Sequence, residues 1–249
     1  MRQFIRIAAL AATCLLPLPA AAQGATSFTP QQRAAIVEII REALRNDPTI
    51  LEEAIAALQA RDMAREREAA RGAIVANRDA LLNDATLPAK GAERPTATIV
   101  EFFDYRCPYC KRMSPVITEL LGADRGVRVV LVDIPILGPA SVTAARAALA
   151  AQRQGKYAEM HDGLMALRGE PTEAAIMQLA GELRLDRDRL RRDMADPAIG
   201  QRIEANLRLA QALGVQGTPA YVVGNEVLPG AVGLDQLREA IARSRRAPG

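Results

Sequence analysis

The sequence predicts an α/β domain built around a small sheet, with helices inserted midway and a helical arm in front of it. Three observations lead to this prediction. A buried strand at residues 97–103 runs directly into Cys-Pro-Tyr-Cys and a helix. After a second buried strand, helical patterns fill residues 140–213. Between residues 220 and 242 the pattern is strand, turn, strand and a last helix.

Length, composition and charge exclude some classes of function. The chain has 249 residues, 49% hydrophobic and 24% charged, which is enough for one large domain or for a domain plus an appendage. Aromatic residues make up 3% and tryptophan is missing, which argues against nucleic-acid binding on stacked aromatics. Without Arg2 and Arg6, which lie in a segment expected to be removed, the formal charge of +3 falls to +1. We therefore expect no nucleic-acid partner.

Residues 1–22 are interpreted as a secretory signal peptide. Arg2 and Arg6 give the charged start, residues 7–19 are apolar but too short to span a bilayer, and three alanines precede Gln23. A buried N-terminal helix is the weaker alternative, and the residues before Cys14 are a poor lipidation signal. No other apolar run approaches the length of about 18 residues that a membrane span needs. We expect a soluble mature protein in the periplasm.

Residues 23–90 are predicted to form a helical arm. An apolar stripe at helical spacing indicates one helix over residues 30–44, and Asn46-Asp47-Pro48 then breaks it. A second helix continues the stripe through Leu58, but the stripe lapses over residues 61–71, where arginine and glutamate dominate. Such a segment is a solvated linker or an oligomerisation segment with residues 36–58 as its seam. We favour the second and expect a homo-oligomer.

Residues 86–96 contain Pro88, Gly91 and Pro95 and mark a boundary, so the domain is placed at residues 91–249. Strands are predicted at 97–103 and 127–134, and the helix between them extends from the cysteine motif to about residue 121.

The helical insertion, at about residues 140–213, follows the second strand. Its predicted helices cover residues 140–154, 157–167, 172–183, 186–194 and 196–213. Thr218-Pro219 then leads into predicted strands at 220–223 and 226–228 and a helix at 234–242.

Cys107 and Cys110 are the two cysteines of the mature chain, and export places them in an oxidising compartment. A bridge between them closes too short a loop to stabilise a fold of this size, so a reactive pair is the better interpretation. Cys107 would begin a helix, where free N–H groups and the dipole stabilise a thiolate, and Pro108 is tolerated in the first turn. We expect Cys107 to be the exposed nucleophile and the more buried Cys110 to resolve the mixed disulfide.

Two metal sites are alternatives. A zinc site lacks a second cysteine pair and has only His161 as a histidine, which is otherwise interpreted as structural. A Cu(I) site at Cys107 and Cys110 is chemically reasonable, because soft thiolates suit Cu(I).

Other residues near the motif each have two possible interpretations. Glu101 precedes Cys107 by six residues in the strand and either relays the Cys110 proton or faces water at a sheet edge. Aromatic residues gather around the thiols and form either a peptide-binding surface or core: Phe102, Phe103, Tyr105 and Tyr109.

Three motifs in order resemble the DsbA-like family of bacterial thiol-disulfide oxidoreductases: FFDYRCPYCK at 102–111, PILGP at 135–139 and GVQGTP at 214–219. The helical arm is most similar to that of the ScsC branch, named for suppression of copper sensitivity. The resemblance covers residues 30–245 and implies a thioredoxin fold with a helical insertion. It also implies a cis Pro219 beside the active-site pair, substrate contact through Thr218, and a buried-acid role for Glu101.

For activity, the resemblance implies exchange with protein disulfides and no cofactor beyond the redox-active Cys107–Cys110 disulfide. Tyr109 replaces the histidine that favours the thiolate in DsbA itself, which indicates a weaker oxidant; Tyr109 and Pro108 are expected to contact substrate. We favour a disulfide isomerase or reductase because of the arm, with a DsbA-type oxidase and a Cu(I)-binding copper-tolerance protein as alternatives. The expected partners are cysteine-containing client proteins and a membrane redox protein.

Overall fold

The computed structural model describes residues 28–246, so the predicted signal peptide at residues 1–22 and Cys14 lie outside the described part. Contacts divide the chain into two compact units, one ending at Leu58 and one beginning at Gln59. Within residues 28–246, no helix is both long enough and apolar enough to cross a bilayer.

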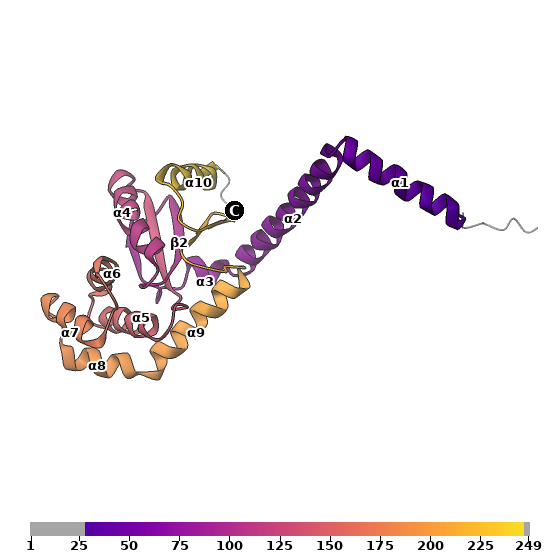
Figure 1. The fold of residues 1–249 in the computed structure, drawn as a ribbon. Helices are drawn as coiled ribbons and strands as arrows, with labels where there is room; N and C mark the ends of the chain where they lie inside the picture. The colour runs from indigo at the N-terminus through magenta and orange to yellow at the C-terminus, as the bar shows by residue number, and fades with distance from the viewer. Residues whose placement is uncertain (1–27, 247–249) are drawn as a thin grey trace, which may run out of the picture. The chain divides into compact units, whose positions relative to one another are not determined.

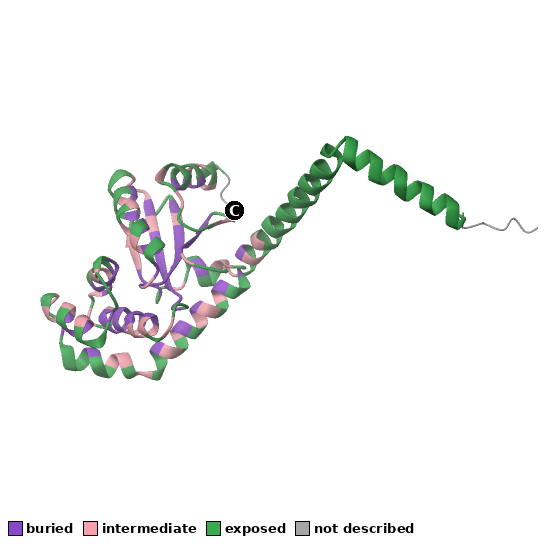
Figure 2. Ribbon diagram, viewed as in Figure 1, coloured by how far each residue is buried: buried purple, intermediate pink, exposed green. Residues whose placement is uncertain are grey.

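The first unit contains α1 (Pro30–Asn46) and the start of α2 (Thr49–Ala76). The α1 helix begins with a capping box: Gln32 N–H donates to Thr29 Oγ1 at 3.2 Å, and Thr29 N–H donates to Gln32 Oε1 at 2.9 Å. The predicted break is present, and Asp47 Oδ1 accepts the N–H of Thr49 at 3.1 Å where α2 begins. All residues from 28 to 58 are exposed, the apolar stripe included (Figure 2).

The second unit is built on a five-stranded sheet in the order β1-β3-β2-β4-β5. Figure 1 labels its central strand, β2. Strands β2 and β3 are parallel, from Ala97 opposite Val127 to Phe103 opposite Asp133, and the other neighbours are antiparallel. The bounds of the strands are β1 Ala89–Gly91, β2 Ala97–Phe103, β3 Val127–Asp133, β4 Ala220–Val223 and β5 Glu226–Pro229.

Both faces of the sheet are covered, which is why its central strands are almost continuously apolar. On one face, Ile99, Phe103 and Leu131 pack with α4 (Pro108–Ala123), α10 (Leu234–Arg246) and the inserted helices. On the other face, Phe102 packs in a second cluster that includes residues of α3 (Arg78–Leu82) and α9 (Pro197–Ala212). This arrangement is a thioredoxin-like fold, as the resemblance implied.

The inserted helices pack around α5, whose alanine-rich sequence is largely buried. Small side chains let α6, α8 and α9 approach its backbone closely. Side-chain caps begin three of these helices, from Thr172, Asp186 and Asp196, and thereby define the breaks seen in the sequence. The helices are α5 Pro139–Gln152, α6 Tyr157–Ala166, α7 Glu173–Glu182, α8 Arg187–Ala195 and α9 Pro197–Ala212.

Strand β1 was not predicted, because three residues between prolines are too few to show an alternating pattern. Where the sequence indicated only a boundary, Ala89 pairs with Val130 and Gly91 with Arg128. Gly91 has φ +96°, and a Cβ there would clash with the carbonyl oxygen of Val127. The segment predicted as arm, residues 23–90, also includes Ile74, Leu81 and Leu87, which are buried in the core of the second unit.

Candidate active site

The cysteine motif forms the junction between β2 and α4. Cys107 is the N-cap of α4, with extended backbone angles, and Pro108 occupies the first turn. The N–H of Cys107 donates to the Asp104 carbonyl oxygen at 3.1 Å, and the Cys107 carbonyl accepts the N–H of Lys111 at 3.1 Å. The Cys107 side chain therefore lies at the end of α4 where free N–H groups and the helix dipole favour an anion.

Both cysteines are free thiols, and both are buried. Cys110 is fully buried, as expected one turn into the helix, but Cys107 is only 4% exposed. The prediction of an exposed Cys107 is therefore wrong. The segment before β4 covers the sulfur, and the Cys107 thiol donates to the Thr218 carbonyl oxygen at 3.2 Å.

The Thr218–Pro219 segment lies against the Cys107 thiol, although it is more than 100 residues away in the sequence. The Thr218–Pro219 peptide bond is cis, as the resemblance implied. Burial raises the pKa of Cys110 well above its ordinary value, and Thr218 acts in the opposite direction. Thr218 is half-buried and Pro219 buried.

Glu101 lies inside the sheet and not at a solvent-facing edge, so the water-facing alternative is wrong. It is 3% exposed on the central strand β2, directly opposite Tyr221 of β4. The Tyr221 hydroxyl donates to Glu101 Oε1 at 3.2 Å. Burial raises the pKa of Glu101 to about 7, while the Tyr221 hydrogen bond and the charge of Lys90 act in the opposite direction.

Tyr221 connects this carboxyl to the thiols. Burial raises the pKa of Tyr221, and negative charge on Glu101, Cys110 and Cys107 raises it further. These four acidic groups therefore lie within electrostatic reach of one another in a buried region. The region holds a thiol that resists deprotonation, Cys110, and a carboxyl whose pKa suits proton transfer near neutral pH, Glu101.

The aromatic residues around the motif divide between core and surface. Phe103 and Tyr105 pack edge-to-face, with ring centroids 5.1 Å apart, and Phe102 lies in the core on the opposite sheet face. Only Tyr109 of the four is exposed, at 52%, with the Arg112 guanidinium 4.1 Å from its ring centroid. Of these four aromatic residues, only Tyr109 is placed to contact a bound peptide.

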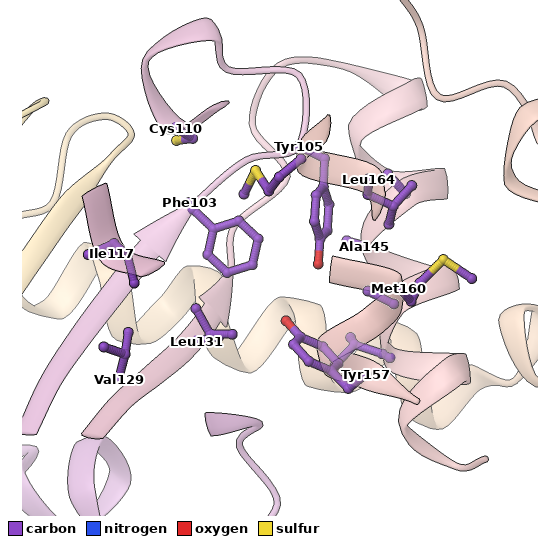
Figure 3. Packing of buried hydrophobic residues seen from close by; sticks show 14 of the residues in the cluster. Phe103, Tyr105, Cys110, Ile117, Val129, Leu131, Ala145, Tyr157, Met160 and Leu164 are labelled. Atoms are coloured by element: carbon purple, nitrogen blue, oxygen red, sulfur yellow. The ribbon is translucent and has the colours of Figure 1, made fainter. Parts of the chain in front are cut away.

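His161 belongs to the buried aromatic cluster between the sheet and the insertion. Its Nδ1 lies 3.2 Å from the Tyr105 hydroxyl, and burial lowers the pKa of His161 to about 3. Tyr157 stacks on His161, and Figure 3 shows the hydroxyl groups of Tyr105 and Tyr157 pointing toward each other. The neutral, packed ring fits the structural interpretation of His161.

Three buried polar residues were not singled out from the sequence: Tyr221, Asp104 and Asp133. Tyr221 and Asp133 occupy inward-facing strand positions, where a polar group among apolar residues is the available signal. Asp104 follows β2 directly, three residues before Cys107. Their partners lie in distant parts of the sequence, so alternation alone could not identify what they contact.

An apolar surface lies near the motif. Ile136 is 46% and Leu137 41% exposed. Arg106 of the active-site turn donates to the Leu137 carbonyl oxygen and forms an ion pair with Glu170 at 2.8 Å. Across residues 28–246, no group of three or more histidine, cysteine or acidic side chains is arranged to hold a metal ion. A Cu(I) ion would therefore depend on the two thiols.

Two family models match the chain. The DSBA-like thioredoxin domain matches residues 98–242, and the copper resistance protein ScsC N-terminal domain matches residues 32–65. The solved structure of a thioredoxin-like oxidoreductase from Silicibacter pomeroyi is 45% identical with a TM-score of 0.67, covering 69% of this chain and 99% of that chain. The catalytic domain of Proteus mirabilis ScsC is 31% identical with a TM-score of 0.65, covering 71% of this chain and 99% of that chain.

Among curated proteins, the Na⁺/H⁺ antiporter NhaA 3 of Salinispora tropica is 35% identical over 154 residues, which is 61% of this chain and 24% of the antiporter. The chain thus spans about a quarter of the length of the antiporter relatives. The site geometry, the fold and the domain match agree: the chain belongs to the DSBA-like thioredoxin domain family.

Proposed function

We propose that this chain is a periplasmic thiol-disulfide oxidoreductase that acts on protein disulfides, chiefly as an isomerase or reductase. One observation carries the proposal: the Cys107 thiol lies at the N-terminus of α4, 3.2 Å from the carbonyl oxygen of Thr218, while Cys110 is buried one turn further on. A relative of known structure is described as a thioredoxin-like oxidoreductase, which supports this reading.

In the proposed reaction, the Cys107 thiolate attacks one sulfur of a client disulfide. A mixed disulfide forms and the other client sulfur leaves as a thiolate. Cys110 then loses its proton and attacks the Cys107 sulfur. The client leaves as a dithiol, two electrons have moved to it, and Cys107 and Cys110 are joined as a disulfide. In isomerisation, a second client thiol attacks the mixed disulfide instead, and the pair returns reduced.

Glu101 is the proposed acceptor of the Cys110 proton. The burial that raises the pKa of Cys110 makes its thiolate scarce at neutral pH, so the resolving step needs a base. Glu101 is buried nearby with a pKa of about 7, and Tyr221 lies within electrostatic reach of both groups.

The protein is proposed to bind its clients through apolar side chains and through main-chain hydrogen bonds. Tyr109, Ile136 and Leu137 expose apolar surface near the motif, and Pro108 is exposed beside Cys107. Thr218 would hydrogen-bond an extended client segment through its backbone. The proposed partners are cysteine-containing clients and a membrane redox protein that recycles the pair.

The arm is proposed to assemble the protein into a homo-oligomer. The apolar stripe of α1 is exposed, with Ile39 at 65%, Ile40 at 52% and Val37 at 51%. Isolated apolar residues on a surface are ordinary, but a continuous stripe on a helix indicates an interaction face. An oligomer would present several thiol pairs to one misfolded client, which favours isomerisation.

The test is refolding of a scrambled, multi-disulfide substrate by full-length protein, Ile40→Asp and Ala34→Asp. Ile40 lies in the apolar stripe, whereas Ala34 lies on the other side of α1 with Glu38. We expect the wild type and Ala34→Asp to restore substrate activity and Ile40→Asp to lose most of this activity. Oxidation of a reduced substrate without reshuffling would instead identify a DsbA-type oxidase. Failure of both reactions would contradict thiol exchange.

Binding of Cu(I) is a second candidate, favoured by the match of residues 32–65 to the copper resistance protein ScsC N-terminal domain. The two thiols would supply the ligands. Competition with a Cu(I) chelator tests it, and affinity that survives Cys107→Ser would contradict a paired-thiolate site.

A further inference from the structure

Asp104 has a buried carboxylate with three hydrogen-bond donors. Oδ1 accepts the N–H of Arg106 at 2.7 Å and the hydroxyl of Ser141 at 2.8 Å, and Oδ2 accepts the N–H of Leu137 at 3.0 Å. Asp104 is 1% exposed and Ser141 is fully buried. The donors come from the active-site turn itself and from the segment that begins α5, so the carboxylate joins two parts of the chain.

The backbone of Asp104 contacts the first residue of the redox pair. Its carbonyl oxygen accepts the N–H of Cys107 at 3.1 Å. One residue thus connects the start of α5, through its side chain, to Cys107, through its main chain.

We propose that Asp104 is a positioning residue that holds the 104–107 turn against the start of α5 and so sets the equilibrium between the dithiol and disulfide forms. This inference rests on the proposed thiol-disulfide exchange. The dithiol form can ionise at Cys107, and the free N–H groups at the start of α4 stabilise that thiolate only while the turn holds Cys107 in place. A disulfide carries no anion and needs them less. Loss of the side-chain contacts should therefore destabilise the dithiol form more than the disulfide form.

The experiment is equilibration of full-length protein with glutathione, measured for wild type, Asp104→Asn, Ser141→Ala and the double variant. In this reaction Cys107 and Cys110 give up two protons and two electrons and form one disulfide, while glutathione disulfide becomes two glutathione thiols. Asparagine keeps the shape of Asp104, but its amide nitrogen cannot accept a hydrogen bond. Ser141→Ala removes one donor and changes no charge.

We expect each single variant to shift the equilibrium toward the disulfide by about tenfold, which corresponds to about 30 mV. The double variant should shift it no further than the larger single shift, because both changes break one hydrogen-bonded unit. Asp235→Asn is the matched control, since the Asp235 side chain is 91% exposed, and it should leave the equilibrium unchanged. If Asp104→Asn does not fold, the Ser141→Ala shift decides the test.

Three outcomes would overturn the proposal. A shift in Asp104→Asn alone would indicate an effect of charge and not of position. Additive shifts in the double variant would mean that the two residues act separately. An unchanged equilibrium, with both redox forms losing thermal stability equally, would make Asp104 purely structural. If the wild-type protein itself does not exchange with glutathione, the proposed function fails, which is a distinct result.

Discussion

The hydroxyl of Tyr221 lies 3.2 Å from Oε1 of Glu101, in a direct cross-strand pair between β4 and β2. This hydrogen bond joins the strand that follows Pro219 to the strand that leads to Cys107. It also partly offsets the burial that raises the pKa of Glu101 to about 7. A carboxyl in this state can accept a proton near neutral pH without being permanently charged inside the sheet.

Replacement of Glu101 by glutamine should slow the attack of Cys110 on a Cys107 mixed disulfide by about 10²-fold, the lower end of general-base effects. The measurement is release of glutathione from a preformed mixed disulfide across pH 5–9. In the wild type the rate should rise with pH and begin to level above about pH 7, where Glu101 is deprotonated. A variant with the wild-type rate and pH profile would contradict this role.

Tyr221→Phe should move the midpoint of that pH profile upward. The Tyr221 hydrogen bond lowers the pKa of Glu101, so its removal leaves the effect of burial less opposed. The same release assay gives the midpoint. A midpoint that stays in place or moves down would show that the profile reports a group other than Glu101.

Cys110→Ser should trap the Cys107 mixed disulfide with a client, because the resolving thiol is removed and serine cannot replace it. Cys107→Ser should form no such adduct with the buried Cys110 thiol. Non-reducing electrophoresis after incubation with a disulfide-containing client distinguishes the two. Trapping by Cys107→Ser and not by Cys110→Ser would reverse the proposed roles, and equal trapping by both variants would contradict them.

Asp133→Asn should make the protein more stable than wild type, by an amount that grows with pH. Burial raises the pKa of Asp133 from 3.8 to about 7, although the Tyr157 hydroxyl donates to its Oδ2 at 2.7 Å and lowers the pKa, and the nearby charge of Asp104 raises it further. The native state therefore holds a proton that the unfolded chain has lost between about pH 4 and 7. Asp133 therefore makes its full contribution to the free energy of unfolding below about pH 4, and this contribution is lost as the pH rises to about 7.

Denaturant unfolding of both proteins at pH 4, 5.5, 7 and 8 tests this expectation. The difference in free energy should increase by on the order of 2–4 kcal/mol up to about pH 7 and then stay constant. Contributions from Glu101 and His161 occur in both proteins and cancel in the difference. A difference that does not change with pH would mean that Asp133 titrates like an exposed carboxyl.

Ile40→Asp should lower the mass of the assembled protein, because a charge in the apolar stripe of α1 cannot be buried without a large cost. Size-exclusion chromatography with light scattering gives the mass, and Ala34→Asp should retain the wild-type value. Equal masses for the wild type and both variants would show that the apolar stripe of α1 does not assemble the protein.

The sequence alone determined the elements around the redox pair. Strand β2 and the helix after Cys107 were predicted within two residues of their bounds, because a buried strand followed directly by a Cys-x-x-Cys motif is a strong local signal. The capped helices of the insertion and the break at Asp47 followed from local hydrogen bonding in the same way. The resemblance of three motifs was enough to imply the cis Thr218–Pro219 bond.

Only the tertiary structure decided what surrounds those elements. Burial of Cys107 depends on Thr218, the partner of Glu101 is Tyr221, and the carboxylate of Asp104 is held by Ser141. Each contact joins segments that are distant in the sequence, and strand or helix periodicity reports which side of an element is buried but not what covers it. Strand β1 was not predicted for a related reason, since its three residues form a strand only because β3 pairs with them.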